Sequence, residues 1–300
     1  MKSKIAVSFL ILFCLAACQS AAGPSDPGRF QVLATTNIVA DVVQQVGGDL
    51  IQVTALLPAG TDPHTFEPRP ADAAALADAR LVFANGAGLE EFLQPLLESS
   101  GAQDRLVEVS SGIQLLVDAE DPDHAGGDPH TWMDPNNVLV WVENIRAALT
   151  RLDPSHAAEY LANAQAYALA LRELDEWIVD QVAGLPPAQR LLVSDHAVFG
   201  YFAEQYGFTQ LGTITGSFSS GASPSARELA ALEDSIRSAG VRAVFVSQTV
   251  NDDLAARVAA DTGVQLVALY HGSLSEAGGQ ADTYLELMRY NVRAIVSALK

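Results

Sequence analysis

The segment 153-DPSHAAEYLANAQAYALALRELDEWIVDQVAGLPP-187 has no glycine or proline between Pro154 and Gly184, and most of its residues favour helix. An aspartate before Pro154 is typical of a helix start, and the closing Gly-Leu-Pro-Pro ends the pattern. These signals predict one long helix over residues 155–183, preceded by further helix formers from residue 136. A helix of this length is a stiff connector, whereas a hinge would be rich in flexible residues.

Short apolar runs alternate with helix-like stretches on both sides of this segment. Before it, the runs are 30–35, 51–57, 81–86 and 105–109, and the helices 37–47, 70–79 and 89–99. After it, the runs are 190–195, 209–214, 242–247 and 264–270, and the helices 197–206, 224–239, 252–262 and 281–299. This alternation predicts parallel sheets flanked by helices. We therefore predict the α/β class, with an N-terminal lobe (30–150), a rigid connecting helix (151–186) and a C-terminal lobe (187–300).

The first residues are typical of an export signal. Residues 1–17 combine a positive start, MKSK, with an apolar run too short to span a bilayer. The tetrapeptide 15-LAAC-18 resembles a lipobox, in which cleavage leaves lipid on Cys18. Ordinary cleavage near Ala17 and an uncleaved anchor are the alternatives. Residues 18–29 form a polar tether. We expect an exported protein on the extracytoplasmic face of a membrane, in the periplasm or at the cell surface, held there by its N-terminal lipid alone.

Composition and charge limit the classes of partner. The chain has 300 residues, of which 49% are hydrophobic, and this is typical of a globular protein. Its formal net charge is −19, and it becomes −21 when Lys2 and Lys4 leave with the signal. Such a surface repels nucleic acid and tolerates cations, which excludes a nucleic-acid-binding protein. Cys14 also leaves with the signal, so the mature chain has one cysteine and forms no internal disulfide.

Three of the six histidines lie in similar settings, at the edges of predicted elements. His64 and His130 lie in the matching stretches 62-DPHTFEP-68 and 128-DPHTWMDP-135, and His196 directly follows a predicted strand. Ligands of parallel α/β sheets lie at the carboxyl ends of strands. We expect the aspartate of each DPHT stretch to form a turn or to orient its histidine. No HxxxH, HxH or CxxC pair is present, so ordinary loop histidines remain the alternative to a transition-metal site.

A carboxylate would complete a tetrahedral shell around three neutral imidazoles. Asp282, at the start of the last predicted helix, is one candidate, and its alternative role is that of an N-cap or a first-turn acid of that helix. His124, in an acidic loop, and His271, at the end of a strand, are possible accessory ligands. The alternative for His124 is a solvated loop. His156 is expected at the surface.

Five stretches resemble the metal-binding solute-binding proteins of ABC importers, the zinc and manganese uptake family. They are TDPHTFEPRPADAAALADA, DPHTWMDPNN, SDHAVFGYFAEQYG, PSARELAALEDSIR and ADTYLELMRYNV. The resemblance implies two α/β lobes joined by a long backbone helix, with the metal in the cleft between them. It implies that the ligands are His64, His130, His196 and Asp282. Manganese members often have glutamate at the third of these positions, so three imidazoles favour Zn²⁺, with Mn²⁺ possible.

The resemblance also implies a function. It predicts an exported lipoprotein, monomeric and not an enzyme, that captures zinc and delivers it to an ABC permease in the cytoplasmic membrane. Two departures from the family are the short acidic loop with the single His124, and His271 where relatives have a small or acidic residue. The alternatives are a manganese receptor, an exported zinc hydrolase, and an adhesin with a structural metal. A hydrolase would need an open coordination position and a general base, and no HExxH motif is present.

Overall fold

The computed structural model describes residues 29–117 and 126–300. The predicted signal peptide, Cys18, the tether up to residue 28 and His124 lie outside the described residues. None of the helices in the described part of the chain combines the length and the apolar character needed to cross a membrane.

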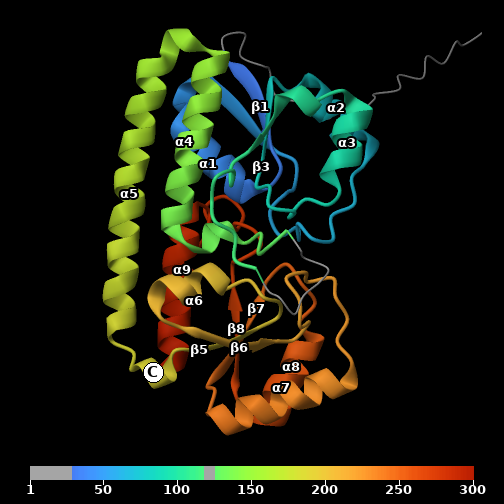
Figure 1. Ribbon diagram of the computed structural model, residues 1–300, viewed down its shortest axis with the longest axis vertical. Helices are drawn as coiled ribbons and strands as arrows, with labels where there is room; N and C mark the ends of the chain where they lie inside the picture. Colours follow the sequence, from blue (N-terminus) through green and yellow to red (C-terminus); the bar gives the residue numbers. More distant parts are fainter. Residues whose placement is uncertain (1–28, 118–125) are drawn as a thin grey trace, which may run out of the picture.

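Two parallel four-stranded sheets form the centres of two lobes (Figure 1). The first has the order β2-β1-β3-β4, with strands β1 (Phe30–Ala34), β2 (Ile51–Ala55), β3 (Leu81–Ala84) and β4 (Leu106–Glu108). The second has the order β6-β5-β7-β8, with strands β5 (Leu191–Ser194), β6 (Thr209–Thr213), β7 (Ala243–Ser247) and β8 (Gln265–Leu269). All strand pairs are parallel. The prediction of an α/β fold with two parallel-sheet lobes is confirmed.

Helices join the strands of each sheet in the expected alternation. In the first lobe these are α1 (Asn37–Gly47), α2 (Pro70–Asp78) and α3 (Leu93–Ser100). In the second they are α6 (Gly200–Tyr206), α7 (Ala226–Ala239), α8 (Asp253–Thr262) and α9 (Tyr284–Leu299). Three of them begin three or four residues later than the sequence predicted, namely α3, α6 and α9. The segments before α6 and α9 belong to loops instead.

Helix α4 (Pro135–Leu152) packs against α1 and β4 of the first lobe, and the longer α5 (Ala157–Ala183), which follows the short turn Pro154–His156, is the connector between the lobes. Helix α5 runs along one side of both lobes (Figure 1). Its buried residues recur every three or four positions, so one face packs inward; they are Tyr160, Ala164, Tyr167, Leu171, Leu174, Ile178 and Val182. The predicted long helix is therefore present. The ring of His156 is partly exposed and contacts Asp153 at 2.5 Å, as a surface histidine would.

One hydrophobic core continues from the first lobe into the second. It includes Val39 of α1, Trp141 of α4, Leu171 of α5, Phe245 of β7 and Val292 of α9, all of which are fully buried. Helix α9 contacts both α5 and α1. Because these contacts join the lobes directly, the lobes are fixed by more than the connector.

Candidate metal centre

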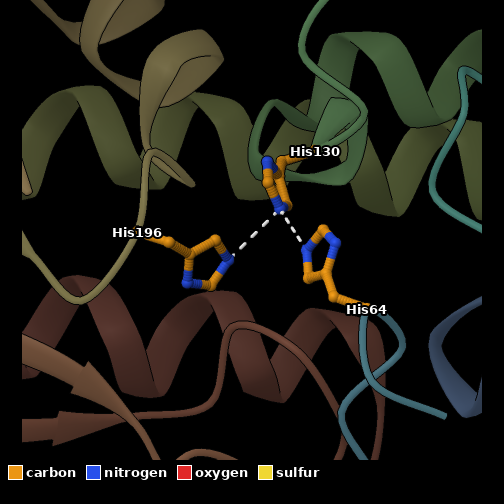
Figure 2. Close-up of side chains that lie close together, drawn as sticks. All are labelled: His64, His130 and His196. Carbon is orange, nitrogen blue, oxygen red and sulfur yellow. Dashed lines mark hydrogen bonds between the residues drawn. The ribbon is translucent and has the colours of Figure 1, made fainter. Parts of the chain in front are cut away.

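Three imidazoles converge where the two lobes meet (Figure 2). His64 lies in the loop after β2, His130 lies just before α4, and His196 lies in the loop after β5. The Nε2 atom of His130 is 3.1 Å from Nε2 of His64 and 3.3 Å from Nε2 of His196. His130 and His196 are buried, and His64 is half-buried. The structure therefore brings together all three histidines that the sequence predicted.

The two DPHT stretches place their histidines with the same local turn. In each, the aspartate Oδ1 accepts a hydrogen bond from the backbone N–H of the histidine two residues later. The distance is 3.0 Å for Asp62 and His64, and 2.9 Å for Asp128 and His130. Such turns are a common use of aspartate, and the intervening proline restricts the backbone further. The repeat is thus one local structure used twice, as predicted for the two aspartates.

A carboxylate also holds the ring of two of the histidines. Nδ1 of His130 is 2.8 Å from Oδ1 of Asp128, and Nδ1 of His196 is 2.8 Å from Oδ1 of Asp195. A proton on Nδ1 makes each contact a hydrogen bond and leaves the lone pair on Nε2. Two lone pairs that face each other at 3.3 Å repel, unless a cation lies between them.

The spacing of the Nε2 atoms fits a small transition metal. Zinc–nitrogen bonds of about 2.0–2.1 Å in a tetrahedron place neighbouring nitrogens about 3.3–3.4 Å apart. The two measured separations, 3.1 and 3.3 Å, are close to this value. Nitrogen donors at this spacing suit zinc and its neighbours in the first transition row.

The environment shifts the pKa values of the two carboxylates in opposite directions. Burial raises the pKa of Asp128 to about 8, although the N–H of His130 partly opposes this. Burial also acts to raise the pKa of Asp195, but His271, His196 and the N–H of Ser247 outweigh it and lower that pKa. A cation on Nε2 of His130 would favour the charged form of Asp128, because it attracts the carboxylate through the ring.

Buried hydrogen bonds fix the His130 loop from both lobes. Asn85, at the end of β3, donates through Nδ2 to the carbonyl of Pro129 at 2.9 Å. The hydroxyl of Tyr201, on α6 of the second lobe, donates to the carbonyl of Asp128 at 2.8 Å. These contacts restrict the motion of the His130 loop. Less conformational entropy is therefore lost when a metal binds.

The structure does not bring Asp282 to the three histidines. Two groups of potential ligand atoms occur in the described part of the chain, and Asp282 is in neither. Its Oδ2 accepts a hydrogen bond from the N–H of Gly278 at 2.9 Å. Thr283, and not Asp282, caps helix α9, with its side chain accepting from the N–H of Glu286. The carboxylate is therefore used to close the loop before α9, so neither the predicted ligand role nor the predicted cap is observed.

Sequence reasoning overlooked Asp195 and left the role of His271 open. Asp195 Oδ1 lies 2.8 Å from Nδ1 of His196 and 3.5 Å from Nε2 of His271. The signal for Asp195 was available, because it directly precedes His196, and an aspartate also lies close before His130, two residues earlier. His271 is fully buried, and its ring lies 5.3 Å from that of His196 between centroids.

Comparisons with known proteins agree with a metal centre. The family model "Zinc-uptake complex component A periplasmic" matches residues 32–298. The manganese-binding lipoprotein MntA of Halalkalibacterium halodurans is 36% identical over 303 residues, which cover 99% of this chain and 99% of that protein. The Mn-bound periplasmic metal binding protein from Candidatus Liberibacter asiaticus has a TM-score of 0.81 and 31% identity, covering 91% of this chain and 100% of that one. The periplasmic zinc binding protein TroA from Treponema pallidum has a TM-score of 0.83 and 26% identity, covering 91% and 99%.

Proposed function

Because this chain belongs to the Zinc-uptake complex component A family of metal-binding receptors, we propose that it captures zinc outside the cytoplasmic membrane for an ABC importer. In this proposal it binds one ion between its lobes and delivers the ion to the permease. Its function is binding and release, without a chemical reaction on the metal. The protein works as a monomer.

The convergence of three Nε2 atoms at the lobe junction is the observation that carries the proposal. Asp128 and Asp195 hold two of the rings so that the Nε2 lone pairs point at one another. A divalent cation removes the repulsion between these lone pairs and uses them as ligands. We propose His64, His130 and His196 as the ligands. The proposal does not include Asp282, whose carboxylate bonds to Gly278.

The choice of zinc rests on the donors. Imidazole nitrogens suit zinc, whereas manganese prefers sites with more oxygen donors. Manganese is the second candidate, because the relative that is 36% identical over 99% of the chain is named manganese-binding. One of the similar structures is Mn-bound, and another is of a zinc binding protein.

We further propose that Cys18 carries the lipid that holds the receptor at the membrane. The support is the lipobox-like 15-LAAC-18 and the name of the similar MntA, a lipoprotein. The tether after Cys18 would let the folded part move between solution and permease. Labelling with a radioactive fatty acid in cells tests this, and a Cys18→Ala protein that still takes up label would contradict it.

Calorimetric titration of the metal-free protein with zinc and with manganese tests the cargo. We expect one zinc ion per chain, bound at least tenfold more tightly than manganese. His130→Ala should lose stoichiometric zinc, because it removes the ligand that contacts both other rings, and His156→Ala is the matched surface control. Tighter binding of manganese than of zinc would make manganese the cargo. Full zinc retention by His130→Ala would contradict the three-histidine site.

A further inference from the structure

His271 is a buried histidine whose ring makes no hydrogen bond in the described part of the chain. It is fully buried, and neither of its ring nitrogens has a hydrogen-bond partner among residues 29–117 and 126–300. Buried polar groups in folded proteins are nearly always hydrogen-bonded, so an unpaired imidazole needs an explanation. An apolar residue would fill the same space without leaving two nitrogens unpaired.

The environment of His271 contains two further potential ligands. Asp195 Oδ1, His196 and His271 offer ligand atoms that all lie within 4.8 Å of one another, and all three residues are buried. Oδ1 of Asp195 is 3.5 Å from Nε2 of His271, close to the edge of about 3.3–3.4 Å in a tetrahedral zinc shell. Nδ1 of His196 contacts Asp195 at 2.8 Å through a proton, and it offers a lone pair to a metal when that proton leaves and the contact widens.

Space beside Asp195 is also available. Asp195 borders a cavity of about 140 Å³, whose other walls include Thr215, Ser220 and Asn251. Polar groups on these walls can hold water, so an ion that reaches Asp195 need not shed its whole hydration shell at once.

We infer that Asp195, His196 and His271 form an inner metal-binding position that shares His196 with the three-histidine site. The inference rests on the proposed receptor function. His196 would use Nε2 for the outer position and Nδ1 for the inner one. When a metal takes Nδ1, the single proton of the neutral ring moves to Nε2, which removes the lone pair that the outer position needs. The two positions therefore bind one ion in alternation and not two ions together.

The inner position differs chemically from the outer one. It has one carboxylate oxygen and two imidazole nitrogens, whereas the outer position has three nitrogens. An oxygen donor makes a site more suitable for harder divalent ions, and its charge offsets that of the ion. The receptor would thereby hold one ion at either of two adjoining positions. Only the outer position depends on the half-buried His64.

Zinc titration of variants that lack the outer ligands tests the inference. We expect His64→Ala/His130→Ala to bind one zinc ion at least 100-fold more weakly than the unmodified protein. Adding His271→Leu should abolish this residual binding, whereas adding His156→Ala as a matched control should leave it unchanged. Binding of cobalt(II), followed by its visible absorption, gives a second measurement on the same variants.

The outcomes separate the inner position from the receptor function. If the unmodified protein binds no zinc, the function itself fails. If the unmodified protein binds zinc but the double variant binds none, only the inner position is wrong. If the double variant does not fold, the single variant His64→Ala replaces it. In the His64→Ala background, His271→Leu should weaken zinc binding at least tenfold. In the unmodified protein the same change should weaken zinc binding less than threefold. Equal effects in the two backgrounds would overturn the inference. His271→Leu should melt no lower than the unmodified metal-free protein.

Discussion

At the scale of single residues, the carboxylates behind the histidines determine what the site can bind. Asp128 and Asp195 each contact Nδ1 of a histidine at 2.8 Å, so they select the tautomer that presents a lone pair on Nε2. At His64, Asp62 accepts a hydrogen bond from the backbone N–H of the histidine. The most exposed of the three proposed ligands is thus positioned through this backbone turn.

Asp128 should make the stability of the metal-free protein depend on pH. Its pKa is raised from 3.8 to about 8, so the folded state holds a proton that the unfolded state has lost between these values. The contribution of this group is therefore fully present below pH 4 and is lost as pH rises toward 8. Asp128→Asn should remove this contribution to the slope of the free energy of unfolding against pH, which is at most about 1.4 kcal/mol per pH unit in this range. Urea unfolding of both proteins at pH 5 and pH 8 measures the difference, and equal slopes would contradict the assignment.

At the scale of helices and strands, local sequence explains most elements but not the loops between them. The apolar face of α5 and its breaker after Ala183 are local signals, and the helix was predicted within two residues. Helix α6 begins at Gly200 and not at residue 197, because the N–H of Ala197 donates to the distant carbonyl of Ser217. No local pattern contains that contact.

The same limit applies to the ligands. Element order places each of the three histidines after a strand or before a helix, and the resemblance to the uptake family then singled them out as ligands. The fourth predicted residue, Asp282, depends on how the loop before α9 folds, and there its carboxylate bonds to Gly278. The cluster of Asp195 with His271 joins the ends of β5 and β8, which pair with different sides of β7.

Helix α5 should owe its stability to its buried face. Leu171 is fully buried on this helix, whereas Leu169, two positions earlier, is 57% exposed. Leu171→Ala should lower the free energy of unfolding by about 2–5 kcal/mol because it leaves a cavity. Leu169→Ala should change it by about 0.5 kcal/mol or less, and both changes keep a good helix former. Denaturant unfolding measures both values, and similar losses would mean that the buried face of α5 contributes no more to stability than its exposed face.

At the scale of the whole molecule, the lobes are joined around the site by polar contacts as well as by the core. Nε1 of Trp132, in the first lobe, donates to the carbonyl of His271 at 2.9 Å, and the hydroxyl of Tyr284 donates to the carbonyl of Trp132 at 2.7 Å. A cavity of about 340 Å³ lies nearby between the lobes, lined by residues of both, among them Gly60 and Ser273. Release of a buried ion requires some of these contacts to open.

Ser273 is the contact most directly connected to the loop of His64. Its Oγ accepts hydrogen bonds from Nδ2 of Asn37 at 2.8 Å and from the N–H of Gly60 at 3.0 Å. Asn37 begins α1, and Gly60 lies four residues before His64, so one buried hydroxyl of the second lobe holds two segments of the first. Breaking these bonds should favour the open molecule without removing a ligand.

Ser273→Ala should therefore speed the release of zinc. A loss of about 1–2 kcal/mol in contacts made only when the lobes are closed corresponds to about 5–30-fold faster dissociation. Stopped-flow mixing of the zinc-loaded protein with an excess of chelator measures the rate. Ser99→Ala is the matched control, because the Ser99 hydroxyl donates to the carbonyl of Leu96 within its own helix, α3. An unchanged rate in Ser273→Ala would mean that the ion leaves without separation of the lobes at this contact, and the path would then have to lie on the side of His64 itself.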